Sequence, residues 1–144
     1  MLPISTGLLS QPTKFVQKAI VMHPQQGLLL ALQRPLVYTE DEGLWDLPGG
    51  KVDHGEDNLQ AIQREIQEET GLFVTAVRVQ WVQTAVSERT GVYYIFAGYH
   101  CRALSAAVAL SEEHHAYQWL PPTEFMRLPS TPFLQALVRE AFRL

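Results

Sequence analysis

The chain has 144 residues, of which 47% are apolar and 18% are charged, and its formal net charge at pH 7 is −4. This composition is typical of one folded domain with a single core, and it excludes an intrinsically disordered chain. The acidic balance also argues against a surface that binds polymeric nucleic acid, because such surfaces are basic.

The chain contains one cysteine, Cys101, so an intrachain disulfide and a cysteine zinc cluster are both excluded. We expect Cys101 to be a buried residue within a strand. Residues 1–15 lack the basic start and long apolar run of a secretion signal, and no apolar stretch approaches the roughly 18 to 20 residues of a membrane span. These features predict a cytoplasmic protein without a membrane partner.

The first predicted elements are two strands. Residues 1–13 carry prolines, a glycine and polar residues, and we expect an irregular lead-in there. Residues 14–23 and 28–33 are apolar or β-branched runs on either side of a Pro-Gln-Gln-Gly turn. This pattern predicts a β-hairpin.

A loop over 36–43 with three acidic residues and a short extended piece over 44–48 follow the hairpin. We expect Gly49 and Gly50 to form a loop that a ligand can approach closely, since glycine has no Cβ.

A helix is predicted next. It should begin after Asp57, a good N-cap residue, and end at Gly71, which suits the residue just past a helix. Leu59, Ile62 and Ile66 recur at helical spacing and are predicted to face the core.

The rest of the chain predicts a second hairpin, formed by residues 73–86 and 92–102. The remaining predicted elements are a connection over 103–110, a short strand over 116–120, a short helix over 121–128 and an amphipathic helix over 131–144. The order of strands and helices predicts an α/β fold with a mixed sheet, and we interpret residues 1–144 as one domain.

Carboxylates crowd one face of the predicted central helix. Glu65, Glu68 and Glu69 stand at i, i+3 and i+4, and Glu56 lies nine residues before the first of them. On an open helix, each like-charge pair at this spacing destabilises the helix by roughly a few tenths of a kcal/mol, which is about as much as an oppositely charged pair would stabilise it. A cluster of this kind on its own is most often a solvated acidic face. The alternative is that a hard divalent cation is the missing partner, and Mg²⁺ or Mn²⁺ suits oxygen ligands.

The arrangement of residues 50–72 resembles the Nudix box of the Nudix hydrolases, which include MutT-like enzymes. The positions that carry the resemblance are Gly50, Glu56, Arg64, Glu65, Ile66, Glu68, Glu69, Gly71 and Leu72. The resemblance implies an α/β/α sandwich with a mixed central sheet, and hydrolysis of an acid anhydride in a phosphorus-containing compound.

The resemblance also implies roles for the box residues. Glu68 and Glu69 would be the main metal ligands, and Glu65 a further ligand or the general base. Glu56 would be an outer or second-metal ligand, and the carbonyl group of Gly49 another ligand. Arg64 would orient the glutamates.

Outside the box, the family pattern points to Glu113 and Arg34, and the residue types alone add Trp119. Glu113, rather than Glu112, would supply an additional acidic ligand or base, with a solvated loop as the alternative. Arg34 would contact phosphate or form a surface ion pair. Trp119 would contact a base or pack in the core. His114 and His115 are candidates to lie near the site, but we interpret them as residues of a solvated loop.

The substrate is predicted by elimination, because markers of several Nudix subfamilies are missing. We expect a nucleoside triphosphate or modified nucleotide to be cleaved to monophosphate and pyrophosphate. The alternatives are a nucleoside diphosphate linked to a sugar or other group, and a nucleotide-binding regulator on the same scaffold. The partner is then a small nucleoside-diphosphate-containing molecule, and a homodimer stays open.

Overall fold

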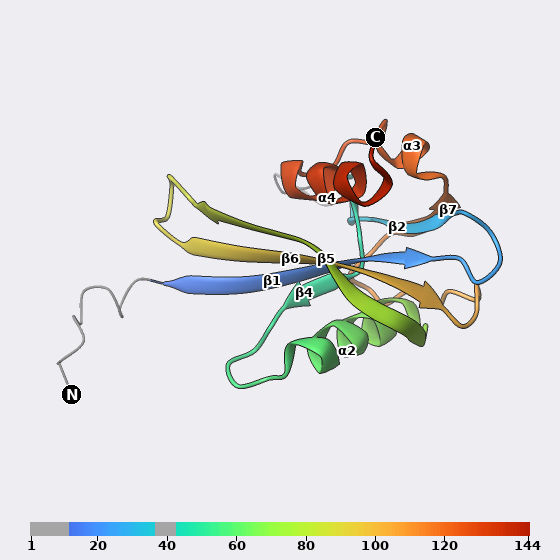
Figure 1. Cartoon of the computed structure of the whole chain (residues 1–144), viewed down its shortest axis with the longest axis horizontal. Coiled ribbons are helices and arrows are strands. Elements are labelled where there is room, and N and C mark those ends of the chain that lie inside the picture. Colours follow the sequence, from blue (N-terminus) through green and yellow to red (C-terminus); the bar gives the residue numbers. More distant parts are fainter. Residues whose placement is uncertain (1–11, 37–42) are drawn as a thin grey trace.

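A mixed sheet forms the middle layer of the molecule (Figure 1), as the computed structural model of residues 12–36 and 43–144 describes it. Its central path runs β3-β2-β1-β6-β5, while β4 pairs with β1 and β7 with β2. Strands β1 and β6 are parallel, and the other pairs are antiparallel. The strands are β1 (Thr13–Met22), β2 (Leu29–Gln33), β3 (Trp45–Asp46), β4 (Gly49–Lys51), β5 (Val74–Val86), β6 (Tyr93–Ala103) and β7 (Ala116–Leu120).

Helices cover both faces of this sheet. Helix α2 (Asn58–Thr70) lies on one face, and α3 (Pro122–Phe125) and α4 (Pro132–Phe142) lie on the other (Figure 1). The predicted α/β/α sandwich with a mixed sheet is therefore confirmed. No helix in the described residues is long and apolar enough to cross a membrane.

The two hairpins are confirmed, but the predicted glycine loop is wrong. Gly49 and Gly50 belong to strand β4, which pairs with β1 through Lys18 and Gln17. A Cβ on Gly49, whose φ is +145°, would overlap the backbone oxygen of Gln17. The glycines therefore serve close packing of β4 against β1, and that packing draws the start of the box into the sheet.

Helix α2 has the predicted ends. The Asp57 side chain accepts a hydrogen bond from the Gln60 N–H at 3.0 Å. Gly71 ends the helix in the left-handed region, with φ of 72°. Ile62 and Ile66 are fully buried, but Leu59 is 44% exposed, so its predicted core position is wrong. Helical spacing indicates the side of a helix, not how far the facing surface extends, and Leu59 lies in the first turn.

The core has two parts, one on each side of the sheet. Ile62 and Ile66 of α2 pack with Tyr99 of β6 in the first, and Leu137 and Val138 of α4 pack in the second.

Ile66→Ala should lower the free energy of unfolding by about 2 to 5 kcal/mol, because Ile66 is fully buried and truncation leaves a cavity. Urea unfolding would measure the loss. Leu59→Ala, on the same helix but exposed, is the control and should change stability by less than about 1 kcal/mol. Equal losses for both variants would contradict the assignment of the core.

The remaining predictions have mixed outcomes. The connection over 103–110 and the strand over 116–120 are confirmed, whereas α3 ends at Phe125, before the predicted 128. Cys101 is 1% exposed on β6, as expected, and burial raises the pKa of its thiol to about 12. The lead-in lies outside the described residues except at its end, where β1 already begins at Thr13, and the acidic part of the 36–43 loop also lies outside them.

Candidate active site

Arg64 gathers three of the four box glutamates. Its guanidinium lies 2.7 Å from Glu56 Oε2, 3.2 Å from Glu65 Oε1 and 3.1 Å from Glu68 Oε2. The hydrogen bond to Glu56 is the main reason that the pKa of Arg64 is raised, and the same bond lowers the pKa of Glu56. The fixed fork of a guanidinium suits this role, because its donors hold several carboxylates in one orientation.

Glu69 points the other way, into the interior. The residue is 2% exposed, and its Oε1 accepts a hydrogen bond from the Gly49 N–H at 2.9 Å. Burial raises the pKa of Glu69 to about 8, and the nearby carboxylates of Asp46 and Glu65 add to the rise, whereas Lys18 opposes it.

Glu65 and Glu113 belong to the same region of negative charge. Burial is the largest cause of the raised pKa of Glu65, and both Glu68 and Glu113 raise it further against the opposing effect of Arg64. A carboxyl oxygen of Glu113 lies within 4.8 Å of ligand atoms of Glu69 and His114. The fold therefore brings the predicted loop acid to the box helix.

Asp46 is the centre of a second network, which no motif in the sequence indicated. Its Oδ2 lies 3.0 Å from Lys18 Nζ, 3.3 Å from Arg34 Nε and 3.6 Å from His114 Nε2. Burial alone would raise the pKa of Asp46, but the neighbouring Lys18, His114 and Arg34 together hold it well below its usual value.

His114 corrects a prediction. It was expected in a solvated loop, but its side chain is only 5% exposed and lies between Asp46 and Glu69. His115, the next residue, is exposed as expected. The sequence did contain a signal that Lys18 is functional, because it is a charged residue in a strand whose end is otherwise largely buried. For His114 the only signal was its position next to Glu113.

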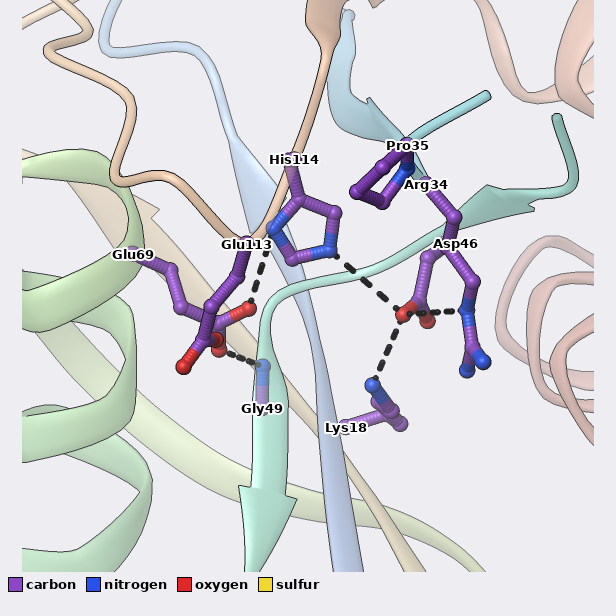
Figure 2. A pocket seen from close by; sticks show the side chains of 8 residues that line it. All are labelled: Lys18, Arg34, Pro35, Asp46, Gly49, Glu69, Glu113 and His114. Carbon is purple, nitrogen blue, oxygen red and sulfur yellow. Dashed lines mark hydrogen bonds and ion pairs between the residues drawn. The ribbon is translucent and has the colours of Figure 1, made fainter. Parts of the chain in front are cut away.

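Glu69 and Glu113 meet the Asp46 network at a cavity of about 350 Å³ (Figure 2). Arg64 and the three glutamates that it contacts are not among the residues that line this cavity. Figure 2 shows His114 between Glu69 and Asp46, with Lys18 and Arg34 converging on Asp46. Acidic groups thus line one side and cationic groups the other. The lining residues are Lys18, Arg34, Pro35, Asp46, Gly49, Glu69, Glu113 and His114.

A second cavity of about 330 Å³ adjoins the first, because both are lined by Lys18, Arg34 and Asp46. It extends between the sheet and the start of α4 and is mainly apolar. Its other lining residues are Val16, Gln83, Ala85, Phe96, Thr131, Pro132, Phe133 and Leu134.

Trp119 lines neither of these cavities. Its indole N–H donates to the Ala106 carbonyl oxygen at 3.3 Å, and its ring meets that of His23 edge to face at 5.0 Å. It packs against the core on the α2 side of the sheet, which matches the structural alternative weighed for it.

The acidic side of the first cavity fits a divalent cation. Its donors are carboxylate oxygens, the type that Mg²⁺ and Mn²⁺ prefer. Glu65 and Glu69 carry raised pKa values partly because other carboxylates lie near them, and a cation would relieve that repulsion. These residues suit a divalent cation that prefers oxygen ligands, and Mg²⁺ as that cation stays a prediction.

Comparison with known proteins assigns the family. The family model described as "NUDIX domain" matches residues 15–141. The chain is 29% identical over 119 residues to the CTP pyrophosphohydrolase of Escherichia coli K12, covering 83% of this chain and 85% of that protein. It is 33% identical over 121 residues to a MutT-like protein of Streptomyces ambofaciens, covering 80% and 69%.

Solved structures agree with the family model. The solution structure of the E. coli ORF135 protein superposes with a TM-score of 0.78 at 26% identity, covering 99% of this chain and 95% of that one. The MutT protein of Methanosarcina mazei superposes with a TM-score of 0.76 at 25% identity, covering 93% and 96%. The chain therefore belongs to the Nudix family and is a hydrolase of phosphoanhydride bonds.

Proposed function

We propose that this protein is a Mg²⁺-dependent pyrophosphohydrolase that cleaves a nucleoside triphosphate or modified nucleotide to monophosphate and pyrophosphate. The observation that carries the proposal is the pair of adjoining cavities. One is charged and the other mainly apolar, and Lys18, Arg34 and Asp46 line both. A nucleotide has the same division into charged phosphates and a flat apolar base.

The relatives support a nucleotide substrate. One such relative is the CTP pyrophosphohydrolase described above. Another is the nucleoside triphosphatase NudI of E. coli, to which the chain is 28% identical over 111 residues. A bis(5'-nucleosyl)-tetraphosphatase of Mus musculus, 30% identical over 102 residues, keeps a dinucleotide as the second candidate.

The acidic residues would hold the metal. In this proposal Glu69, Glu68, Glu65, Glu113 and the Gly49 carbonyl are its ligands, with Glu56 as an outer ligand. A bound divalent cation screens phosphate oxygens and helps to activate water. Mn²⁺ is the alternative ion.

The remaining site residues act on the substrate and on protons. Lys18 and Arg34 would neutralise phosphate charge, and Asp46 orients both cations through the ion pairs described above. Arg64 positions the box glutamates. Glu65 is the candidate for proton acceptor, since burial raises its pKa above the usual value.

Ala85→Trp should raise the KM for a nucleoside triphosphate by about tenfold or more, because a bulky ring at Ala85 would fill the apolar cavity, and tenfold corresponds to about 1.4 kcal/mol. Steady-state kinetics would measure the change. Thr84→Trp is the matched control, since adjacent strand residues point to opposite faces. Equal KM values for Ala85→Trp and the unmodified protein would contradict the proposal that the nucleotide base binds in this cavity.

The proposal is tested by a Mg²⁺-dependent hydrolysis screen over nucleoside triphosphates, nucleotide sugars, ADP-ribose and dinucleoside polyphosphates. Turnover of triphosphates would support the proposal, and turnover of only another class would replace the substrate. Tight nucleotide binding without any turnover would favour the regulator. A cytoplasmic location and a homodimer stay predictions.

A further inference from the structure

The two ring nitrogens of His114 face different partners. Nε2 lies 3.6 Å from Asp46 Oδ2, and Nδ1 lies 3.4 Å from Glu69 Oε2. The side chain is 5% exposed, and Nδ1 is a fully buried polar atom with no hydrogen-bond partner among the described residues. Such an atom is costly to bury, so its orientation into the acidic cluster needs a physical reason.

The Asp46 carboxylate faces the opposite side of the ring. It pairs with Lys18 and Arg34 and lies 3.6 Å from His114 Nε2. His114 Nδ1 is thereby directed towards the carboxyl oxygens of Glu69 and Glu113. An imidazole nitrogen in this position can bind a metal ion through its lone pair.

The neighbouring donors are spaced as ligands of one ion. Ligand atoms of Glu69, Glu113 and His114 all lie within 4.8 Å of one another. Donors about 2.1 Å from an octahedral ion lie about 3 Å apart when adjacent and about 4 Å apart when opposite. Small side-chain adjustments would therefore bring the three atoms onto one ion.

We infer that His114 Nδ1 is a metal ligand together with Glu69 and Glu113, so that the site binds Mn²⁺ in preference to Mg²⁺. Mg²⁺ takes oxygen donors in a strict octahedron, whereas sites with nitrogen and oxygen donors bind the first-row transition-metal ions in an affinity order that begins with Mn²⁺. An added nitrogen ligand therefore shifts the preference of the site away from Mg²⁺. This inference rests on the metal-dependent function proposed above and names a ligand that neither the box nor its spacing supplies.

Asp46 supports this assignment. A histidine that binds a metal generally donates its other N–H to a carboxylate or carbonyl, which orients the ring. The Asp46 carboxylate lies on that side of the ring, 3.6 Å from Nε2, and Lys18 and Arg34 also pair with it (Figure 2). The orientation of the metal ligand is thus coupled to the two cations that line both cavities.

The test is pulsed electron paramagnetic resonance of Mn²⁺ bound to the full chain, which detects a nitrogen bonded to the ion. We expect nitrogen coupling that changes when the protein is labelled with nitrogen-15 histidine, an experiment that needs no variant. His114→Asn should abolish the coupling and weaken Mn²⁺ binding by about tenfold or more, with less effect on Mg²⁺. His115→Asn, the exposed neighbour, is the matched control and should retain both.

The outcomes separate the inference from the proposed function. If bound Mn²⁺ shows no coupling to histidine nitrogen and the protein still hydrolyses a nucleotide, then His114 is not a metal ligand. The proposed function would stand in that case. Coupling that survives in His114→Asn would also overturn the ligand role of His114. Histidine coupling without turnover of any substrate would support the metal site and contradict the proposed hydrolysis.

Discussion

Glu69→Gln should lower kcat/KM by about two orders of magnitude or more, while the protein stays folded. The amide keeps an oxygen that accepts the Gly49 N–H bond, so the packing around it is retained. The substitution removes a negative charge where we propose that a cation binds, and electrostatic stabilisation by such preorganised groups contributes strongly to catalysis. Steady-state kinetics with circular dichroism would measure both activity and folding. Full activity would contradict the assigned site.

The same substitution should stabilise the metal-free protein at high pH. Burial raises the pKa of Glu69 from its usual 4.5 to about 8, so the folded state binds a proton that the unfolded state has lost. The contribution of Glu69 to the free energy of unfolding therefore falls as pH rises from about 4.5 to about 8, by up to about 1.4 kcal/mol per pH unit, and stays low above that.

Urea unfolding in a chelator at pH 4 and pH 9 would measure this difference. Glu69→Gln should match the unmodified protein at pH 4 and exceed it at pH 9. Glu68→Gln is the matched control, because the Glu68 side chain is 59% exposed on the same helix. We expect Glu68→Gln to lower turnover as a metal-ligand change without altering the pH dependence of stability. An identical pH profile for Glu69→Gln and the unmodified protein would contradict the buried, proton-binding state.

Asp46→Asn should lower the free energy of unfolding by about 3 kcal/mol at pH 7. It leaves Lys18, whose side chain is 12% exposed, without the carboxylate that it contacts at 3.0 Å. Removing one partner of a buried ion pair costs about 3 to 5 kcal/mol, and the slight exposure of Lys18 sets the lower value. Turnover should fall as well, since Lys18, Arg34 and His114 lose the group that orients them.

The pH dependence of this loss has the opposite sign to that of Glu69. The pKa of Asp46 lies well below its usual 3.8, so its contribution is complete above that value and is lost as pH falls further towards the folded pKa. The difference between Asp46→Asn and the unmodified protein should therefore shrink below about pH 4. Asp53→Asn, at an exposed position, is the control. A constant difference at pH 3 and pH 7 would contradict the charged network.

Much of helix α2 and its acidic face was predictable because the deciding interactions are local. The cap at Asp57 and the end at Gly71 depend on residues within one turn of the helix. Arg64 reaches Glu68 because the two stand at i and i+4. The short strands beside the site were less predictable, because β3 and β4 have two and three residues, too few to show a period of two.

Caps, helical spacing and runs of apolar residues act over short distances, so the box helix, the family pattern and the α/β class are encoded locally in the chain. The meeting of Lys18, Asp46 and His114 beside Glu69 is not, because these residues come from β1, β3 and the segment before β7 and are brought together by the fold. Their charges and nitrogens are buried together by strand pairing and packing. The polar groups that complete the site are thus selected by burial, which depends on contacts between distant parts of the chain.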